Sequence, residues 1–328
     1  MPTTARATGT DKAGRARPLT RAEAAVPPAT RVTHADRVID AQSGTTKGEL
    51  VAFYASVSAL MLPHLRARPV AFLRAPDGVD GAFFFQKHAE AAELPGVMQL
   101  DPSLDPEHEP LLTIPAQRGL LSAAQMNVVE FHTWNATARR IAQPDRIVFD
   151  LDPGSGVTWR RMQEATQLLH GFLDELGLVS FAKTSGGKGM HVVVPLTPHL
   201  GWDAVRAFAQ ALVRHVAEVI PDRFVAKSGP KNRVGKIFID YLRNGFGATT
   251  VCAWSARARP GLGVSVPIAW DELDGLGGAD HWTQHNIASR IAIGNTPWAD
   301  YSSTRQRLSA AMKALGFDPG SEATWQVT

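Results

Sequence analysis

Residues 146–156, RIVFDLDPGSG, place two aspartates at the end of an apolar β-like segment, directly before a turn of Gly and Pro. Because side chains alternate along a strand, Asp150 and Asp152 share one face, while Phe149 and Leu151 share the other. Two like charges on one face repel each other unless a cation lies between them. The segment therefore predicts a strand that ends at a divalent-metal site.

The chain that follows predicts a regular order of elements around this strand. We expect a helix at about 157–175, strands at 178–183 and 190–196, a helix at about 202–218 and a strand at 236–241. This βαββαβ order is shared by ferredoxin-like and RNA-recognition folds, in which the fourth strand lies beside the first. Two further helices are expected near 283–292 and 303–315.

The same topology brings a third acid to the two aspartates. Asp240 ends the predicted fourth strand, and His191 lies on the third, both on the open face if the helices cover the other. Three carboxylates on neighbouring strands suit two divalent ions that act on a phosphorus centre. The structural alternative is that the acids cap strand ends or pair with Arg, and it is the weaker explanation for three converging acids.

A Gly-rich segment, KTSGGKGMH at 183–191, predicts a phosphate cradle beside these acids. Glycines let backbone N–H groups approach an anion, and the segment adds charge and donors through Lys183, Ser185 and Lys188. Arg243 and Arg257 follow the third acid and could clamp a phosphate. The segment does not match a Walker A loop, and a Gly-rich hairpin with solvated lysines is the alternative.

The N-terminal part predicts a separate α/β subdomain at residues 31–145. Residues 48–66 have helical spacing, PVAFLRA and AFFFQKH are β-like, residues 99–120 suggest a long surface loop, and NVVEFHTW predicts another strand. Residues 1–30 are rich in Ala, Thr, Arg and Pro without an apolar period, which predicts a disordered tail or linker. Residues 146–328 form the predicted catalytic core with C-terminal helices.

Composition limits the possible classes of protein. The single cysteine, Cys252, excludes an internal disulfide and a Cys-rich zinc site, and it suits a reducing cytoplasm. No segment predicts a membrane span or a signal peptide. Six basic and two acidic residues lie in residues 1–31, so the rest of the chain is close to neutral. If that part binds nucleic acid, it must do so through local clusters of charge.

At this point the motifs resemble a known family. DLDPG, TSGGKGMH and IFIDYLRNGFGAT are similar to the three catalytic motifs of the archaeo-eukaryotic primase superfamily, and more closely to the polymerase domain of bacterial ATP-dependent DNA ligase D. GTTKGELVAFY, ARARPGLGVSVPI and NTPWADY extend the resemblance over roughly residues 32–315. It implies an α+β, two-layer primase-polymerase fold, with a βαββαβ RNA-recognition-like catalytic core and an N-terminal α/β subdomain.

The resemblance also implies roles for individual residues. Asp150, Asp152 and Asp240 would bind two Mn²⁺ or Mg²⁺ ions. The nucleotide triphosphate would contact Lys183, Ser185, Lys188, His191, Arg243 and Arg257. A DNA 5′-phosphate would contact Arg37 and Lys47, the template base would stack on Phe84 and Phe85, and His132 would lie near the primer terminus. From the strand pattern alone, the two phenylalanines would be core, and we expect one of them to be buried.

The implied activity is metal-dependent addition of NTP or dNTP, preferably ribonucleotides, to 3′-OH ends at gaps and double-strand breaks in non-homologous end joining. Expected partners are DNA ends with a 5′-phosphate, a Ku-type end-binding protein, and ligase or nuclease domains in cis or trans, with no membrane. A cytoplasmic, nucleoid-associated location follows. The sequence lacks a Lys-x-Asp-Gly ligase motif, so it predicts either an excised domain or a stand-alone relative.

Two other functions remain open at this stage. An aspartyl-phosphate phosphatase also begins with Asp-x-Asp after a strand, but Gly154 stands where that class needs Thr or Val. A non-catalytic DNA-end-binding module on an RNA-recognition-like sheet would present aromatic residues on the open face, whereas this sheet presents acids. Metal-dependent nucleotide binding separates these alternatives from a polymerase.

Overall fold

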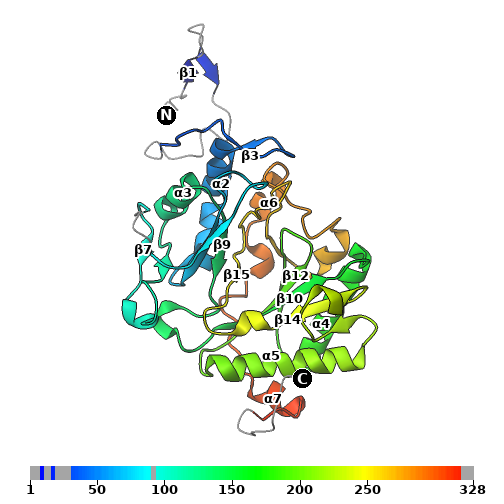
Figure 1. Cartoon of the computed structure of the whole chain (residues 1–328). Coiled ribbons are helices and arrows are strands. Elements are labelled where there is room, and N and C mark those ends of the chain that lie inside the picture. The colour runs from blue at the N-terminus through cyan, green and yellow to red at the C-terminus, as the bar shows by residue number, and fades with distance from the viewer. Residues whose placement is uncertain (1–7, 11–15, 19–30, 90–93, 319–328) are drawn as a thin grey trace, which may run out of the picture.

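The computed structural model describes residues 8–10, 16–18, 31–89 and 94–318. Within the predicted tail it contains only β1 (Thr8–Thr10) and β2 (Ala16–Pro18), which pair antiparallel. The rest of that tail lies outside the described residues, so its disorder stays a prediction. The remainder of the described chain is organised around two main sheets (Figure 1).

The sheet that carries the aspartates has the expected βαββαβ core. Its elements are β10 (Arg146–Pro153), α4 (Trp159–Glu175), β11 (Phe181–Thr184), β12 (Met190–Pro195), α5 (Trp202–Val219) and β14 (Ile237–Asp240). The strand order is β13-β14-β10-β12-β11-β16, which confirms that the fourth core strand lies beside the first. The short strands β13 (Phe224–Val225) and β16 (Pro267–Ile268) form the edges.

The side chains of β10 alternate between the two faces of this sheet and show which face the helices cover. Ile147, Phe149 and Leu151 are buried in a core that includes the apolar side chains of α4 and α5. On the other face, Val148 packs with Val193 and Trp298. The helices therefore fix the sheet from one side, and the polar groups occupy the end of the opposite face near Asp150.

The second main sheet has the order β15-β9-β5-β6. Its strands are β5 (Val70–Arg74), β6 (Phe84–Gln86), β9 (Val128–Thr133) and β15 (Thr250–Val251). It shares a buried core with α2 (Lys47–Leu65) and α3 (Gln117–Gln125). Thr46 and Glu49 form a capping box at the start of α2, where the Thr46 side chain accepts a hydrogen bond from the Glu49 N–H.

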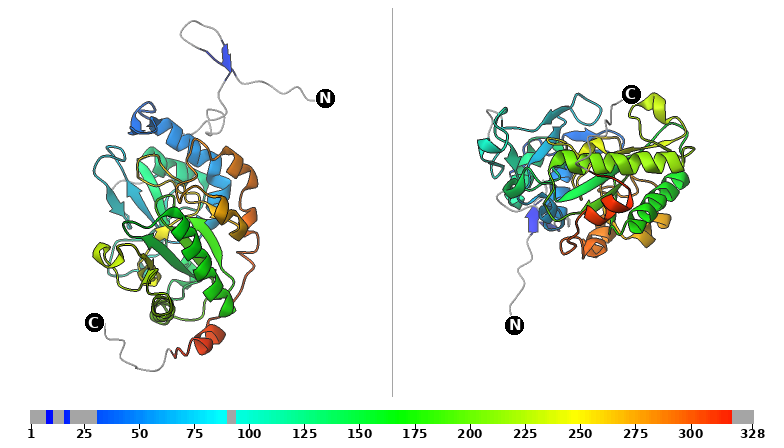
Figure 2. Two further views of the ribbon diagram at one scale, coloured as in Figure 1. Left: turned by 90° about the vertical axis from the view of Figure 1, so that its right-hand side faces the viewer. Right: turned by 90° about the horizontal axis from the view of Figure 1, so that it is seen from below.

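Short elements complete the described chain. They are β3 (Val38–Asp40), β4 (Thr45–Thr46), β7 (Met98–Gln99), β8 (Leu112–Thr113), α6 (Ala288–Ile293) and α7 (Ser309–Ala314). The 3₁₀ turns are η1 (Pro102–Leu104), η2 (Ala138–Arg140), η3 (Pro230–Arg233), η4 (Leu242–Asn244), η5 (Trp270–Gly275) and η6 (Thr296–Trp298). Figures 1 and 2 show α7 at the opposite end of the molecule from α2.

Three expectations differ from the structure. The predicted surface loop at 99–120 contains η1 and β8, and α3 begins inside it at Gln117. The helix at 303–315 is confined to α7, because the backbone before Ser309 is not helical. We expected no membrane-spanning segment, yet α2 has the length and hydropathy of one among the described residues; its burial identifies it as a core helix.

After β14, the chain returns to the core around α2. Thr250 pairs with Thr133 of β9, and residues 252–266 contribute Cys252, Trp254 and Val266 to the core around α2. The division at residue 146 therefore marks where the sheet that carries the aspartates begins, while residues 250–266 pack with the N-terminal part. This return ties the two sheets together.

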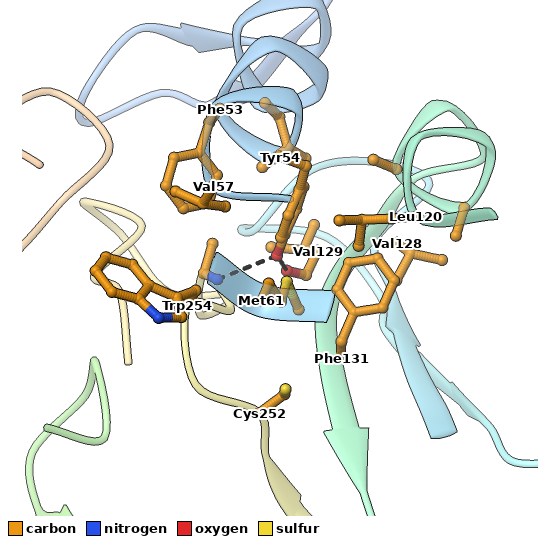
Figure 3. Close-up of a cluster of buried hydrophobic side chains, with 14 of the residues drawn as sticks. Phe53, Tyr54, Val57, Met61, Leu120, Val128, Val129, Phe131, Cys252 and Trp254 are labelled. Carbon is orange, nitrogen blue, oxygen red and sulfur yellow. Dashed lines mark hydrogen bonds between the residues drawn. The ribbon is translucent and has the colours of Figure 1, made fainter. Parts of the chain in front are cut away.

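The Tyr54 hydroxyl joins α2, β9 and the returning segment 252–266 inside the core around α2 (Figure 3). It donates a hydrogen bond to the Val129 carbonyl at 2.5 Å and accepts one from the Ala256 N–H at 3.1 Å. Tyr54 is fully buried, so neither backbone group can turn to water if the hydroxyl is removed.

We therefore expect Tyr54→Phe to lower the free energy of unfolding by about 1–3 kcal/mol, the cost of unsatisfied buried backbone groups. Urea unfolding followed by circular dichroism measures this change. Tyr301→Phe is the matched control, because the Tyr301 hydroxyl forms no hydrogen bond among the described residues. Equal stability of the two variants would contradict this role of Tyr54.

Candidate active site

Four polar side chains form one row across four adjacent strands. Asp150 of β10 lies opposite Asp240 of β14 on one side and opposite His191 of β12 on the other. His191 in turn lies opposite Lys183 of β11. Because residues opposite each other in antiparallel strands project to the same face, the register brings these four groups together. The topology predicted that Asp150, Asp240 and His191 would meet, and the pairing confirms that they are neighbours. Lys183 was expected only as part of the Gly-rich segment.

Asp152 completes an acidic group two residues after Asp150. Single carboxylate oxygens of Asp150, Asp152 and Asp240 all lie within 4.8 Å of one another. Carboxylate oxygens are the ligands that Mg²⁺ and Mn²⁺ prefer, so this donor set fits hard divalent cations. The predicted convergence of the three acids is therefore confirmed.

The electrostatics of two of these acids favour a cation. Burial raises the pKa of Asp152, and the neighbouring Asp150 charge raises it further, although Arg233 opposes the shift. Burial also raises the pKa of Asp240, against the attraction of Arg243. Holding both as carboxylates costs free energy, which a bound divalent cation would recover.

Asp150 and His191 form a tightly coupled buried pair, with His191 Nε2 3.2 Å from Asp150 Oδ1. Burial lowers the pKa of His191 to about 4, against the attraction of Asp150. Burial alone would raise the pKa of Asp150, but His191 and Arg243 hold it below its ordinary value. With a pKa of about 4, His191 is neutral at pH 7. The pair is therefore an ionised carboxylate that accepts a hydrogen bond from a neutral imidazole.

Two arginines lie against the acids. Arg243, which we expected to clamp a phosphate, has Nε 3.1 Å from Asp240 Oδ2 and 3.8 Å from Asp150 Oδ2. Arg233 Nη1 lies 3.0 Å from Asp152 Oδ2 and was not among the predicted site residues. It belongs to η3, whose basic residues are Lys231 and Arg233.

The Gly-rich segment is a compact turn held by Ser185. The Ser185 hydroxyl accepts hydrogen bonds from the N–H groups of Gly187 and Gly189, each at 3.1 Å. Gly189 cannot be replaced without distortion, because a Cβ there would lie 2.0 Å from the Leu151 carbonyl oxygen. The turn is thus pressed against the strand between the two aspartates. Lys188 is exposed at its tip and has no described contact with the acids.

Lys183 lies at the buried end of the row, with Nζ 2.7 Å from the Ser265 hydroxyl. Burial lowers the pKa of this ammonium to about 7. A lysine in this state gains its proton more readily when an anion binds beside it, because the anion stabilises the charged form.

Glu130, a buried acid of β9, was not among the predicted site residues. Glu130 Oε2 lies 2.7 Å from His132 Nε2 and 3.0 Å from Arg257 Nε, and Oε1 accepts a hydrogen bond from the Ala258 N–H. Burial alone would raise the pKa of Glu130, but these partners lower it to about 2. The alternation of Glu130 and His132 in an apolar strand was the available signal. Arg257 also donates a hydrogen bond to the Ser185 carbonyl. Through Arg257, Glu130 therefore links His132 to the Gly-rich turn.

Arg37 and Lys47 lie together at the start of α2, as the resemblance implies. The Lys47 N–H donates to the Arg37 carbonyl, and burial together with the Arg37 charge lowers the pKa of Lys47. Neither side chain has a carboxylate within ion-pair distance in the part of the chain that the structure describes. Arg37 also contacts Asn127 and the Pro76 carbonyl. The pair is a positive site without a negative partner there.

Phe84 and Phe85 lie on β6, an edge strand, and both are exposed, at 39% and 42%. The expectation that one of them is buried was wrong: β6 pairs with only one strand, β5, among the described residues, and both rings are exposed there. Arg74 lies over the Phe84 ring at 4.8 Å, and Phe85 packs edge-on against His132 at 5.2 Å. Phe85 thus connects this aromatic edge with the Glu130 group.

The chain is similar to known proteins along most of its length. Residues 46–298 match the family model described as LigD, primase-polymerase domain. The chain is 54% identical over 285 residues to the multifunctional non-homologous end joining protein LigD of Pseudomonas aeruginosa, covering 86% of this chain and 34% of that protein. It is 29% identical over 293 residues to the bifunctional LigD of Bacillus subtilis, covering 88% of this chain and 47% of that protein. The chain therefore spans a third to a half of the length of these relatives.

A solved structure gives the same result at the level of the fold. The polymerase domain of Mycobacterium tuberculosis ligase D, in complex with DNA, is similar with a TM-score of 0.73 and 29% sequence identity. The match covers 80% of this chain and 94% of that one. It confirms the predicted α+β primase-polymerase fold, and with the family match it confirms the resemblance. The chain belongs to the LigD primase-polymerase domain family.

Proposed function

We propose that this chain is a metal-dependent nucleotidyltransferase that adds nucleotides to the 3′-hydroxyl of DNA at gaps and broken ends during non-homologous end joining. The observation that carries the proposal is the convergence of three carboxylates, Asp150, Asp152 and Asp240, beside a Gly-rich turn and two arginines. Family membership supports the polymerase activity, and the DNA bound to the similar mycobacterial domain supports the substrate.

The reaction forms a bond from the 3′-oxygen of the primer to the α-phosphorus of the incoming nucleotide and releases pyrophosphate. Asp150, Asp152 and Asp240 would hold the metal ions, which when bound would favour the deprotonated 3′-oxygen and offset charge on the phosphates. The chain's own contribution is to hold these three acids in register and to keep Asp150 ionised. His191 does this for Asp150 through its hydrogen bond.

The triphosphate would lie beside these acids, near Lys183 and the Gly-rich turn. Lys183, with its pKa of about 7, would take up a proton when the anionic phosphates arrive. Arg257 is held in place by Glu130, so part of its conformational freedom is lost before the nucleotide binds. Arg243, which now lies against Asp150 and Asp240, could turn its guanidinium to the phosphates once ions occupy the acids. Ser185 and Lys188 would add donors from the Gly-rich turn.

The DNA would extend from this site along the edge of the second sheet. Phe84 and Phe85 offer exposed rings on which a template base could stack. Arg37 and Lys47 offer an unpaired positive site for a 5′-phosphate on the far side of a gap. Preference for ribonucleotides, and recruitment by a Ku-type protein, are further parts of the proposal that the family resemblance supports.

The direct test is primer extension on a short gapped duplex in Mn²⁺, with ATP compared with dATP. We expect Asp150→Asn to lower the extension rate by about 10³-fold or more, because the ions lose a central ligand worth several kcal/mol in the transition state. Binding of the gapped duplex, followed by fluorescence anisotropy, should persist. Asp271→Asn, an exposed acid on η5, is the control. Full extension by Asp150→Asn would refute the proposed site, and binding without extension by the unmodified chain would favour a DNA-binding module.

The raised pKa of Asp152 leads to a second expectation. A carboxyl group whose pKa is higher in the folded than in the unfolded state destabilises the fold when ionised, and this cost disappears as the pH falls through the raised pKa. Asp152→Asn should therefore raise the Tm of the metal-free protein at pH 7, with less effect at acidic pH. Thermal unfolding with a chelator, and then with Mn²⁺, measures both states. Mn²⁺ should stabilise the unmodified chain more than the variant; the opposite order would exclude Asp152 as a ligand.

The positive site at the start of α2 gives a third expectation. Lys47→Ala should weaken binding to gapped DNA that carries a 5′-phosphate by roughly 10-fold, the loss of one charge-assisted hydrogen bond of about 1.5 kcal/mol. Binding to the same duplex without that phosphate should change little. Lys313→Ala, at α7, is the charge-matched control. Equal weakening for both duplexes would show that Lys47 does not recognise the 5′-phosphate.

A further inference from the structure

A second group of metal-ligating side chains lies outside the active site, where the chain leaves β6 and meets the loop before β8. His88 Nε2 is 3.2 Å from Asp105 Oδ2, and His108 Nδ1 is 3.0 Å from Asp105 Oδ1. The two imidazole rings stack with 4.9 Å between their centroids and an angle of 11°. One ligand atom from each residue lies within 4.8 Å of the other two.

Backbone contacts hold these three residues together independently of their side chains. The Ala89 N–H donates to the Pro110 carbonyl at 2.8 Å, and His88 forms an isolated bridge with Leu111. The turn η1 ends at Asp105, whose N–H donates to the Pro102 carbonyl. Asp105 is only 8% exposed, so its carboxylate is fixed at the base of the loop. Preorganised ligands of this kind lower the entropic cost of binding an ion.

The donor set selects a class of metal. Zn²⁺ binds imidazole nitrogen and carboxylate oxygen at about 2.0–2.2 Å in tetrahedral geometry, which places neighbouring ligand atoms roughly 3.3 Å apart. The two separations of 3.2 and 3.0 Å are close to that spacing. Two imidazoles with one carboxylate suit Zn²⁺ and similar transition metals, whereas Mg²⁺ and Ca²⁺ prefer oxygen ligands only. This set therefore differs in chemistry from the three aspartates.

The charge of the loop gives an independent reason to expect a cation. Residues 94–111 contain Asp101, Asp105, Glu107 and Glu109 and no Lys or Arg. Burial would raise the pKa of Asp105, but hydrogen bonds from His108 and His88 hold it below its ordinary value. An ionised ligand thus lies within an acidic loop. That loop also adjoins β6, whose Phe84 and Phe85 are exposed beside a site proposed for DNA, where uncompensated negative charge would repel phosphates.

We propose that His88, Asp105 and His108 bind one Zn²⁺-class ion, which holds the loop at 94–111 against the end of β6. Three protein ligands leave one tetrahedral position for water or for an acid of the loop. The ion joins residues that are 17 and 20 positions apart in the chain and so closes the loop at its base. The alternative is a purely hydrogen-bonded network in which both imidazoles donate to Asp105.

Metal stoichiometry tests the proposal. The tag-free chain with Asp150→Ala, Asp152→Ala and Asp240→Ala lacks the three acids of the active site. Zn²⁺ is titrated into it in competition with a chromophoric chelator. We expect about one tightly held equivalent in this background. His108→Ala or His88→Ala should abolish it, whereas His199→Ala, which removes an exposed histidine outside the cluster, should not. No bound equivalent, or an equivalent that survives both ligand variants, would overturn the proposal.

Proteolysis tests the effect on the loop and does not depend on polymerase activity. A Glu-specific protease should cut after Glu107 in the metal-free protein, and Zn²⁺ should slow that cut at least severalfold. The His108 side chain is exposed, so His108→Ala should not disturb the core. This variant should be cut at the same rate with and without Zn²⁺. If Zn²⁺ leaves the rate unchanged in the chain with all three ligands, the ion does not hold the loop.

Discussion

Repulsion among Asp150, Asp152 and Asp240 is the constraint to which the surrounding structure responds. Their carboxylate oxygens are held within 4.8 Å of one another, and the pKa values of two of them are raised. Side chains on flexible loops would move apart under that repulsion. Here the acids are fixed because they belong to two paired strands, whose opposite face is buried under α4 and α5. Hydrophobic burial on one face thus maintains an unfavourable charge distribution on the other.

Positive groups surround the acids, but the two arginines in contact with them are not buried. Arg243 and Arg233 each contact an acid while staying partly exposed, so they can be displaced by ions or phosphates. Arg257 is held differently, because Glu130 and the Ser185 carbonyl fix it from two sides. Its anchor comes from β9 of the other sheet. The return of residues 250–266 to the core around α2 is what brings this arginine between the two sheets.

The sequence predicted the parts of the site that depend on strand alternation and on strand order. Asp150 and Asp152 share a face because they are two residues apart, and the βαββαβ order places Asp240 and His191 on the adjacent strands. Contacts between the two sheets were beyond that reasoning. Neither the Glu130–Arg257 pair nor the burial of Lys183 by Ser265 follows from local spacing, since each joins residues more than 80 positions apart.

The exposed aromatic residues show the same limit from another direction. A run of apolar residues predicts a buried strand only if both of its sides are covered, and this depends on the strand's place in the sheet. Because β6 is at an edge, Phe84 and Phe85 remain exposed despite their hydrophobicity. Arg37 and Lys47 stand at the start of α2, in the same subdomain, and have no carboxylate partner in the part of the chain that the structure describes. In a chain whose body is nearly neutral overall, such local separation of rings, cations and acids would orient a bound anionic polymer, as the proposed function requires.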